Sequence, residues 1–263
     1  MGIRRMFWDI ETSPNIMFSW KAGYKISLGP DNIIDERQVI CICWKWEGEK
    51  KVHHLRWDDG CDGEMIKEFQ AEILEADEMI AHNGDRFDLK WYNGRHLLHR
   101  LPPIPTPKTV DTLKIARKRF YLNSNRLDYL AKKLFGEGKI RTNFDLWKGC
   151  IEKTEPDPDI RSKNVAKMVR YCKKDALLVE RVWNELRSYE PPSTHAAVFA
   201  SGDDRDKWMC PHCGSPYVVK SKTRVIAKGS IQHQMRCCEC GRYYSISTRA
   251  FDWYLNKKME IGD

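Results

Sequence analysis

The sequence predicts an α/β protein with a mixed five-stranded sheet flanked by helices, followed by a second, smaller C-terminal domain. Three strand-like segments come first, and helical and strand-like segments then alternate up to a long last helix. This order is typical of a mixed sheet whose faces are covered by helices. Of the ten cysteines, five fall within 31 residues near the end of the chain, which indicates a separate domain there.

The five strands are expected at 3–10, 39–46, 51–57, 78–82 and 109–111. The second and third strands form a hairpin, because a short polar stretch with a glycine separates them. Helices are expected at 63–76, 85–98, 112–120, 126–135 and 160–188. In the first helix, Met65, Ile66, Phe69 and Ile73 recur at the spacing of one helical face.

Domain boundaries follow from prolines and cysteines. Pro191 and Pro192 end the long last helix. We therefore expect one domain at 1–190, a linker at 191–206, a cysteine-rich domain at 207–250 and a tail at 251–263.

Most of the net charge of +8 belongs to the cysteine-rich domain, in which eight basic side chains face one acidic side chain. Such a balance favours a nucleic-acid partner, with a merely soluble basic domain as the alternative. No apolar run approaches the roughly 18 residues of a membrane span. The N-terminus leads directly into a strand without the pattern of a signal peptide, so we expect an intracellular, cytoplasmic protein with no membrane partner.

Asp9 and Glu11 stand two residues apart in the first strand, whose other residues are largely apolar. Side chains alternate along a strand, so both carboxylates point to the same face. Neighbouring acids repel each other and lose hydration, and a divalent metal ion with oxygen ligands would relieve this. A solvated strand edge is the alternative.

Further acids and a phenol occur at two later places. Asp88 follows the expected strand at 78–82 and a glycine turn, where it would otherwise stabilise a helix N-terminus. In the last helix, Tyr171 and Asp175 are four residues apart and share one face. Much of this helix is apolar, so these polar groups need polar partners; the alternative is a surface pair.

The cysteine-rich domain contains two Cys-x-x-Cys-Gly knuckles, formed by Cys210 and Cys213 and by Cys237 and Cys240. Glycine permits the tight turn of each knuckle, and two knuckles across a hairpin give a tetrahedral four-thiolate site. We therefore predict one structural Zn²⁺ in a zinc ribbon. Cys238 is the fifth cysteine of this domain and is not expected to be a zinc ligand. The ribbon can hold nucleic acid through its basic and aromatic side chains, or it can bind a protein.

Together, Asp-x-Glu, Asn-x-x-x-Phe-Asp and Tyr-x-x-x-Asp in this order resemble the DnaQ-like 3′–5′ exonucleases of the RNase H-like fold, in the tyrosine-containing DEDDy subgroup. The motifs are similar to those of the proofreading exonuclease domain of family B DNA polymerases. The strings FWDIETSPN, NRLDYLAKKLFG and DLW look like stand-alone, often phage-encoded members that end in a zinc ribbon, which would place the protein in the host cytoplasm.

The resemblance implies roles for individual residues. Asp9, Glu11, Asp88 and Asp175 match the four acids that bind two Mg²⁺ or Mn²⁺ ions, and Tyr171 matches the tyrosine that orients the attacking water. Two such ions supply an activated water, charge neutralisation at phosphorus and a stabilised leaving oxygen. Three accessory positions complete the expected site. Asn83 is expected to touch substrate, Phe87 to pack, and Asp111 either to support the metal ligands or to cap a helix.

The resemblance thus implies a metal-dependent 3′–5′ exonuclease that acts on ends of DNA, single-stranded for preference. Three alternatives stay open at this point: an RNA exonuclease, a nucleic-acid-binding adaptor with a vestigial nuclease site, and a structure-specific endonuclease. A replication or repair protein is conceivable as a partner, because no polymerase domain fits in this chain.

Overall fold

We describe the protein from a computed structural model, which defines residues 2–23 and 26–261. The chain forms two compact units, one spanning Arg4–Glu185 and one comprising the chain from Leu186 onward together with the first residues. None of the helices in these defined ranges is both long and apolar enough to cross a membrane.

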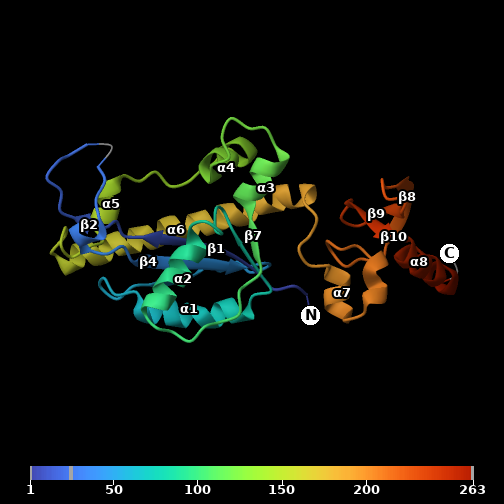
Figure 1. The fold of residues 1–263 in the computed structure, drawn as a ribbon, viewed down its shortest axis with the longest axis horizontal. Helices are drawn as coiled ribbons and strands as arrows, with labels where there is room; N and C mark the ends of the chain where they lie inside the picture. Colours follow the sequence, from blue (N-terminus) through green and yellow to red (C-terminus); the bar gives the residue numbers. More distant parts are fainter. Residues whose placement is uncertain (1, 24–25, 262–263) are drawn as a thin grey trace. The chain divides into compact units, whose positions relative to one another are not determined.

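The larger unit is built on a mixed five-stranded sheet in the order β5-β4-β1-β6-β7 (Figure 1). The central strand β1 pairs antiparallel with β4 and parallel with β6. The prediction of a mixed five-stranded sheet is therefore confirmed. The strand bounds are β1 Arg5–Thr12, β4 Val39–Trp46, β5 His53–Arg56, β6 Glu78–Ala81 and β7 Thr109–Asp111. A separate pair, β2 Ile16–Met17 and β3 Ile33–Asp35, lies outside this sheet.

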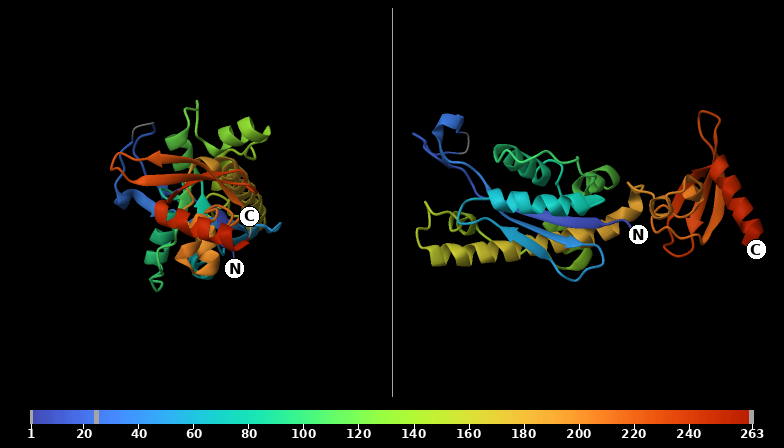
Figure 2. Two further views of the ribbon diagram at one scale, coloured as in Figure 1. Left: turned by 90° about the vertical axis from the view of Figure 1, so that its right-hand side faces the viewer. Right: turned by 90° about the horizontal axis from the view of Figure 1, so that it is seen from below.

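Helices flank the sheet on both faces. Helices α1 (Gly63–Glu75) and α2 (Asp88–Leu98) cover the face that carries Trp8, whose ring stacks on Phe69 at 5.7 Å between centroids. Helix α6 (Pro158–Leu186) runs along the sheet (Figure 2) and covers the face that carries Phe7, which contacts Trp183. Alternate residues of β1 therefore face different helices, as strand geometry requires. The remaining helices of this unit are α3 Thr112–Arg119, α4 Leu127–Phe135 and α5 Phe144–Lys148.

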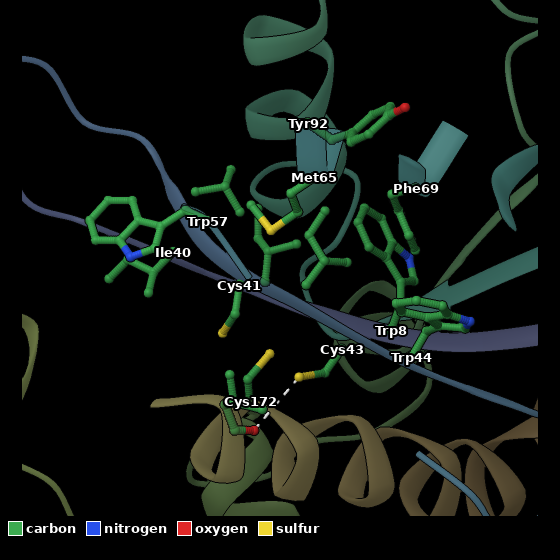
Figure 3. Close-up of a cluster of buried hydrophobic side chains, with 14 of the residues drawn as sticks. Trp8, Ile40, Cys41, Cys43, Trp44, Trp57, Met65, Phe69, Tyr92 and Cys172 are labelled. Atoms are coloured by element: carbon green, nitrogen blue, oxygen red, sulfur yellow. Dashed lines mark hydrogen bonds between the residues drawn. The ribbon is translucent and has the colours of Figure 1, made fainter. Parts of the chain in front are cut away.

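The core under α1 and α2 is rich in aromatic residues, as Figure 3 shows. Trp44 and Tyr92 both meet Phe69 edge-on, and these rings are at most 4% exposed. Full burial of such side chains stabilises the fold by about 1.5–3 kcal/mol each. Three thiols are buried on the opposite face, from Cys41, Cys43 and Cys172 (Figure 3).

A buried ion cluster joins α1 and α2 to the first residue of β4. The side chain of Asp62 is fully buried and accepts hydrogen bonds from the guanidinium of Arg95 at 2.8 and 2.9 Å. It also bonds His99 at 2.6 Å and accepts from the backbone N–H of Val39 at 2.9 Å. These bonds hold the pKa of Asp62 below its usual range against the opposing effect of burial.

Most element bounds differ from the expectation by a few residues, and two differences concern the site. Helix α2 begins at Asp88 rather than at residue 85, because Asn83 adopts a left-handed φ of 69° and 84–87 form a turn. A Cβ on Gly84 would lie 2.4 Å from that of Ala81, so this turn needs glycine. The short helix α5 was not predicted, since five residues give too little periodicity.

The smaller unit is a three-stranded antiparallel sheet in the order β10-β9-β8, with helix α8 packed against it. Its bounds are β8 Val218–Val225, β9 Ile231–Cys237, β10 Tyr243–Ser247 and α8 Thr248–Ile261. The expected linker at 191–206 contains helix α7 (Ala196–Ser201) and the start of a 3-10 helix (Asp204–Trp208), and the expected tail forms most of α8. Burial stabilises the 3-10 helix and α8, because Trp208 and Tyr254 pack with the strand residues in one core.

Candidate active site

The acids predicted from the sequence meet between β1 and α6. Strand β1 directs Asp9 and Glu11 to the face covered by α6, and α6 directs Asp175 toward them. Carboxylate oxygens of these three residues all lie within 4.8 Å of one another. Asp88, the first residue of α2, is held beside them, since its Oδ1 accepts a hydrogen bond from the backbone N–H of Ile10 at 3.0 Å.

The cluster carries more negative charge than its surroundings can balance. Burial, followed by the charges of Asp175 and Asp88, raises the pKa of Asp9 well above its ordinary value. Burial raises the pKa of Glu11 to about 8 and that of Asp88 to about 7, and it raises the pKa of Asp175 as well. Asp9 and Glu11 nevertheless keep part of their surface accessible, so a ligand can reach them.

Two buried oxygens of the cluster, Asp9 Oδ2 and Asp175 Oδ1, accept no hydrogen bond within the defined part of the chain. Buried polar atoms are rarely left without a partner, so each such atom needs an explanation. A hard divalent cation takes carboxylate oxygens as its ligands and would satisfy both atoms at once. The donor set therefore fits Mg²⁺ or Mn²⁺.

Sequence reasoning missed Lys139, which belongs to the loop between α4 and α5. Its Nζ donates to Asp175 Oδ2 at 2.6 Å and lies 3.5 Å from the hydroxyl of Tyr171. Burial lowers the pKa of Lys139, but the charges of Asp175 and Asp9 outweigh it, so the pKa is raised and the side chain stays cationic. A lysine in an irregular loop gives no periodic signal in the sequence.

Tyr171 and Trp147 form the aromatic wall of the cluster. Their rings meet edge-on at 5.7 Å, and Trp147 Nε1 donates to Glu11 Oε2 at 3.1 Å. Burial, followed by the charge of Asp175, raises the pKa of Tyr171, so its hydroxyl remains a neutral hydrogen-bond donor. Trp147 lies within the DLW string of the sequence, but nothing in that string assigned it to the acids.

The accessory positions have distinct structural roles. Asp111 caps helix α3, because its Oδ1 accepts from the backbone N–H of Leu113 at 2.9 Å, and it also accepts from the backbone N–H of Asn83 at 2.9 Å. It thereby fixes the turn that leads to Asp88. The ring of Phe87 packs against the hydrophobic core, with the guanidinium of Arg37 above it at 5.4 Å.

Two cavities are each lined by a residue that bonds an acid of the cluster. One, of about 580 Å³, contains Lys139 and Asn83 and is bordered by further polar and basic side chains, namely His82, Arg117, Asn125 and Arg126. The other, of about 650 Å³, contains Trp147, Phe144 and Arg37. Lys139, which bonds Asp175, lines the first cavity, and Trp147, which bonds Glu11, lines the second.

The three buried thiols lie next to the acids, on the face of the sheet that α6 covers. Cys41 pairs with Glu11 and Cys43 with Asp9 across the β1–β4 ladder. Cys172 donates through Sγ to the backbone carbonyl of Asp9 at 3.2 Å. These small side chains let α6 approach β1 closely, which brings Asp175 to the strand.

The four predicted cysteines of the smaller unit come together. All four sulfurs lie within 4.8 Å of one another, with Cys210 and Cys240 at 3.6 Å and Cys213 and Cys237 at 3.6 Å. Tetrahedral Zn–S bonds of about 2.3 Å need sulfurs at nearly this separation. The knuckle glycines, Gly214 and Gly241, have left-handed φ of 78° and 70°, as expected. This cluster can hold zinc, and Cys238 is exposed outside it.

Comparison of the sequence with protein-family profiles gives no match, and comparison with curated proteins gives none either. Among solved structures, the family B DNA polymerase from the hyperthermophilic archaeon Pyrobaculum calidifontis is similar to 71% of this chain, with a TM-score of 0.53 and 15% identity. The matched region spans 25% of the polymerase chain. At this identity the likeness concerns the fold, and the sheet with its flanking helices is consistent with the RNase H-like architecture predicted.

Proposed function

We propose that this protein is a metal-dependent 3′–5′ exonuclease that removes nucleotides from single-stranded ends of DNA. The observation that supports it best is the cluster of Asp9, Glu11 and Asp175, whose unpartnered oxygens fit a divalent cation. The fold likeness to a family B DNA polymerase agrees with the exonuclease resemblance of the sequence motifs. Asp88, held against β1, completes the set of four acids.

Divalent ions bound by Asp9, Glu11, Asp88 and Asp175 would supply an activated water and neutralise charge at the phosphate. The chain itself positions the other participants. The neutral hydroxyl of Tyr171 orients the water, and Lys139 holds Asp175 ionised and adds positive charge beside the phosphate.

The two cavities beside the acids would hold the substrate on either side of the bond to be cut. Arg117 and Arg126 offer cations to the phosphate backbone in one cavity. In the other, the rings of Phe144 and Trp147 offer stacking surfaces for a terminal base.

The test is degradation of end-labelled oligonucleotides with Mg²⁺ or Mn²⁺. A 5′-labelled DNA strand should give a ladder of shortening products, and a blocked 3′ end should prevent it. Asp88→Asn should abolish the ladder, whereas Asp85→Asn, in the same turn but salt-bridged to Lys114 at the surface, should not. Full activity of a folded Asp9→Asn protein would exclude the mechanism. A matched RNA strand degraded faster than DNA would overturn the choice of substrate.

A further inference from the structure

The sheet of the smaller unit has one covered face and one open face. Met235 is fully buried and His233 is 7% exposed, and the ring of Phe251 of α8 stacks on His233 at 4.0 Å. The hydroxyl of Tyr254, also in α8, reaches the backbone carbonyl of Val218. Helix α8 therefore covers the face to which His233 and Met235 point (Figure 2).

Strand register assigns the side chains of the opposite face, here called the open face. In the ladders, Arg236 of β9 stands between Val219 of β8 and Tyr243 of β10. One step along, Gln234 stands between Lys222 and Ser245, and Arg224 follows in the next row. The open face is thus formed mainly by Lys222, Arg224, Gln234, Arg236, Tyr243 and Ser245.

Apart from the exposed Val219, the open face carries basic and hydrogen-bonding side chains. Lys222, Arg224, Arg236 and Tyr243 are exposed, and the remaining members are hydrogen-bonding side chains without an acid among them. The guanidinium of Arg236 lies 6.0 Å from the ring of Tyr243, which is 54% exposed. Glu239, the single acid of 207–250, belongs to the second knuckle rather than to this face.

We propose that the open face binds a single strand of nucleic acid. This proposal rests on the proposed function, since the strand would be the substrate of the exonuclease. Three cations without an intervening acid match the charge of a phosphate backbone. An exposed tyrosine beside an arginine offers a stacking surface to an unpaired base. Four residue steps along β10 extend about 14 Å, enough for a short stretch of strand.

The test measures binding rather than cleavage, so that failure of the nuclease mechanism does not affect it. The full-length chain carrying Asp175→Asn is titrated into a fluorescein-labelled oligo-dT, and anisotropy is followed over a range of salt concentrations. The open-face variant replaces Lys222, Arg224 and Arg236 by Gln. Its matched control replaces Lys220, Arg249 and Lys258 by Gln, which removes the same charge from the side of α8.

The open-face variant should bind the oligonucleotide at least ten-fold more weakly. The slope of log K against log salt should become less steep by roughly 2, because each single-strand phosphate contact contributes about 0.7 and three cations are removed. The control should keep the slope of the parent protein. Tyr243→Ala should weaken binding about five-fold or more, and Tyr243→Phe should leave it within two-fold.

Zinc content and circular dichroism confirm that each variant is folded. Equal loss in the open-face variant and its control would overturn the proposal in favour of diffuse charge attraction. Unchanged binding in the open-face variant would also overturn it and would leave that face to a protein partner.

Discussion

Replacing Glu11 by Gln tests whether the acid cluster strains the fold when no metal is bound. The pKa of Glu11 is raised from an ordinary 4.5 to about 8, chiefly by burial. A carboxyl with a raised pKa contributes stability that is fully present below about pH 4.5 and is lost as the pH rises to about 8. Because Trp147 donates to Glu11 Oε2, the amide oxygen of Gln can accept the same bond.

The pKa change sets an upper bound of about 5 kcal/mol on this loss. Partial solvent access and relaxation of the site reduce this bound, so we expect roughly 1–3 kcal/mol. At pH 5 the free energies of unfolding of Glu11→Gln and wild type should differ by less than about 1 kcal/mol. At pH 8 the variant should be the more stable by roughly 1–3 kcal/mol.

Urea unfolding in buffer without Mg²⁺ or Mn²⁺ measures this difference. The smaller unit, with its four-cysteine cluster, is the same in both proteins, so its contribution cancels. Adding Mn²⁺ at pH 8 should stabilise the wild type and should stabilise the variant much less. A variant that is less stable than wild type at both pH values would refute the idea that Glu11 is a strained carboxylate.

Three further results are expected. Lys139→Met should lower the turnover number of the proposed exonuclease reaction roughly 10- to 100-fold, because it removes the cation bonded to Asp175. Lys174→Met, which breaks a surface pair with Glu137, should leave that turnover number unchanged. Cys240→Ser should lose the bound zinc, measured by atomic emission, while Cys238→Ser should keep it. Asp62→Ala should lower the free energy of unfolding by about 3–5 kcal/mol in urea titrations, since a buried arginine loses its partner; a loss below 1 kcal/mol would contradict this.

Local spacing was sufficient to predict the parts of the site that lie on regular elements. Asp9 and Glu11 share a face because strand side chains alternate, and Tyr171 and Asp175 share a face because helical positions four apart coincide. The two knuckles are equally local, since a short turn fixes two cysteines in each, and together they predicted a four-sulfur cluster. In each case the geometry is set within about five residues.

The residues that escaped prediction depend on tertiary contacts. Lys139 reaches the acids from a loop, and Trp147 reaches Glu11 from a helix of only five residues. The 3-10 helix that begins in the expected linker and the helix in the expected tail pack in one core through Trp208 and Tyr254, and a local pattern does not reveal this contact. The open face likewise follows from the register of three strands, which includes an irregularity between Lys220 and Lys222.

Lys139 explains how the fold accommodates its acids. Asp9, Glu11, Asp88 and Asp175 crowd one side of β1, and the ammonium of Lys139 bonds Asp175 directly. Burial raises the pKa of each of these four carboxyls, and the charge of Lys139 opposes that rise at all four. Divalent ions bound by these acids would supply the further positive charge, and the bond from Lys139 to Asp175 would fix one of their ligands from a loop outside the sheet.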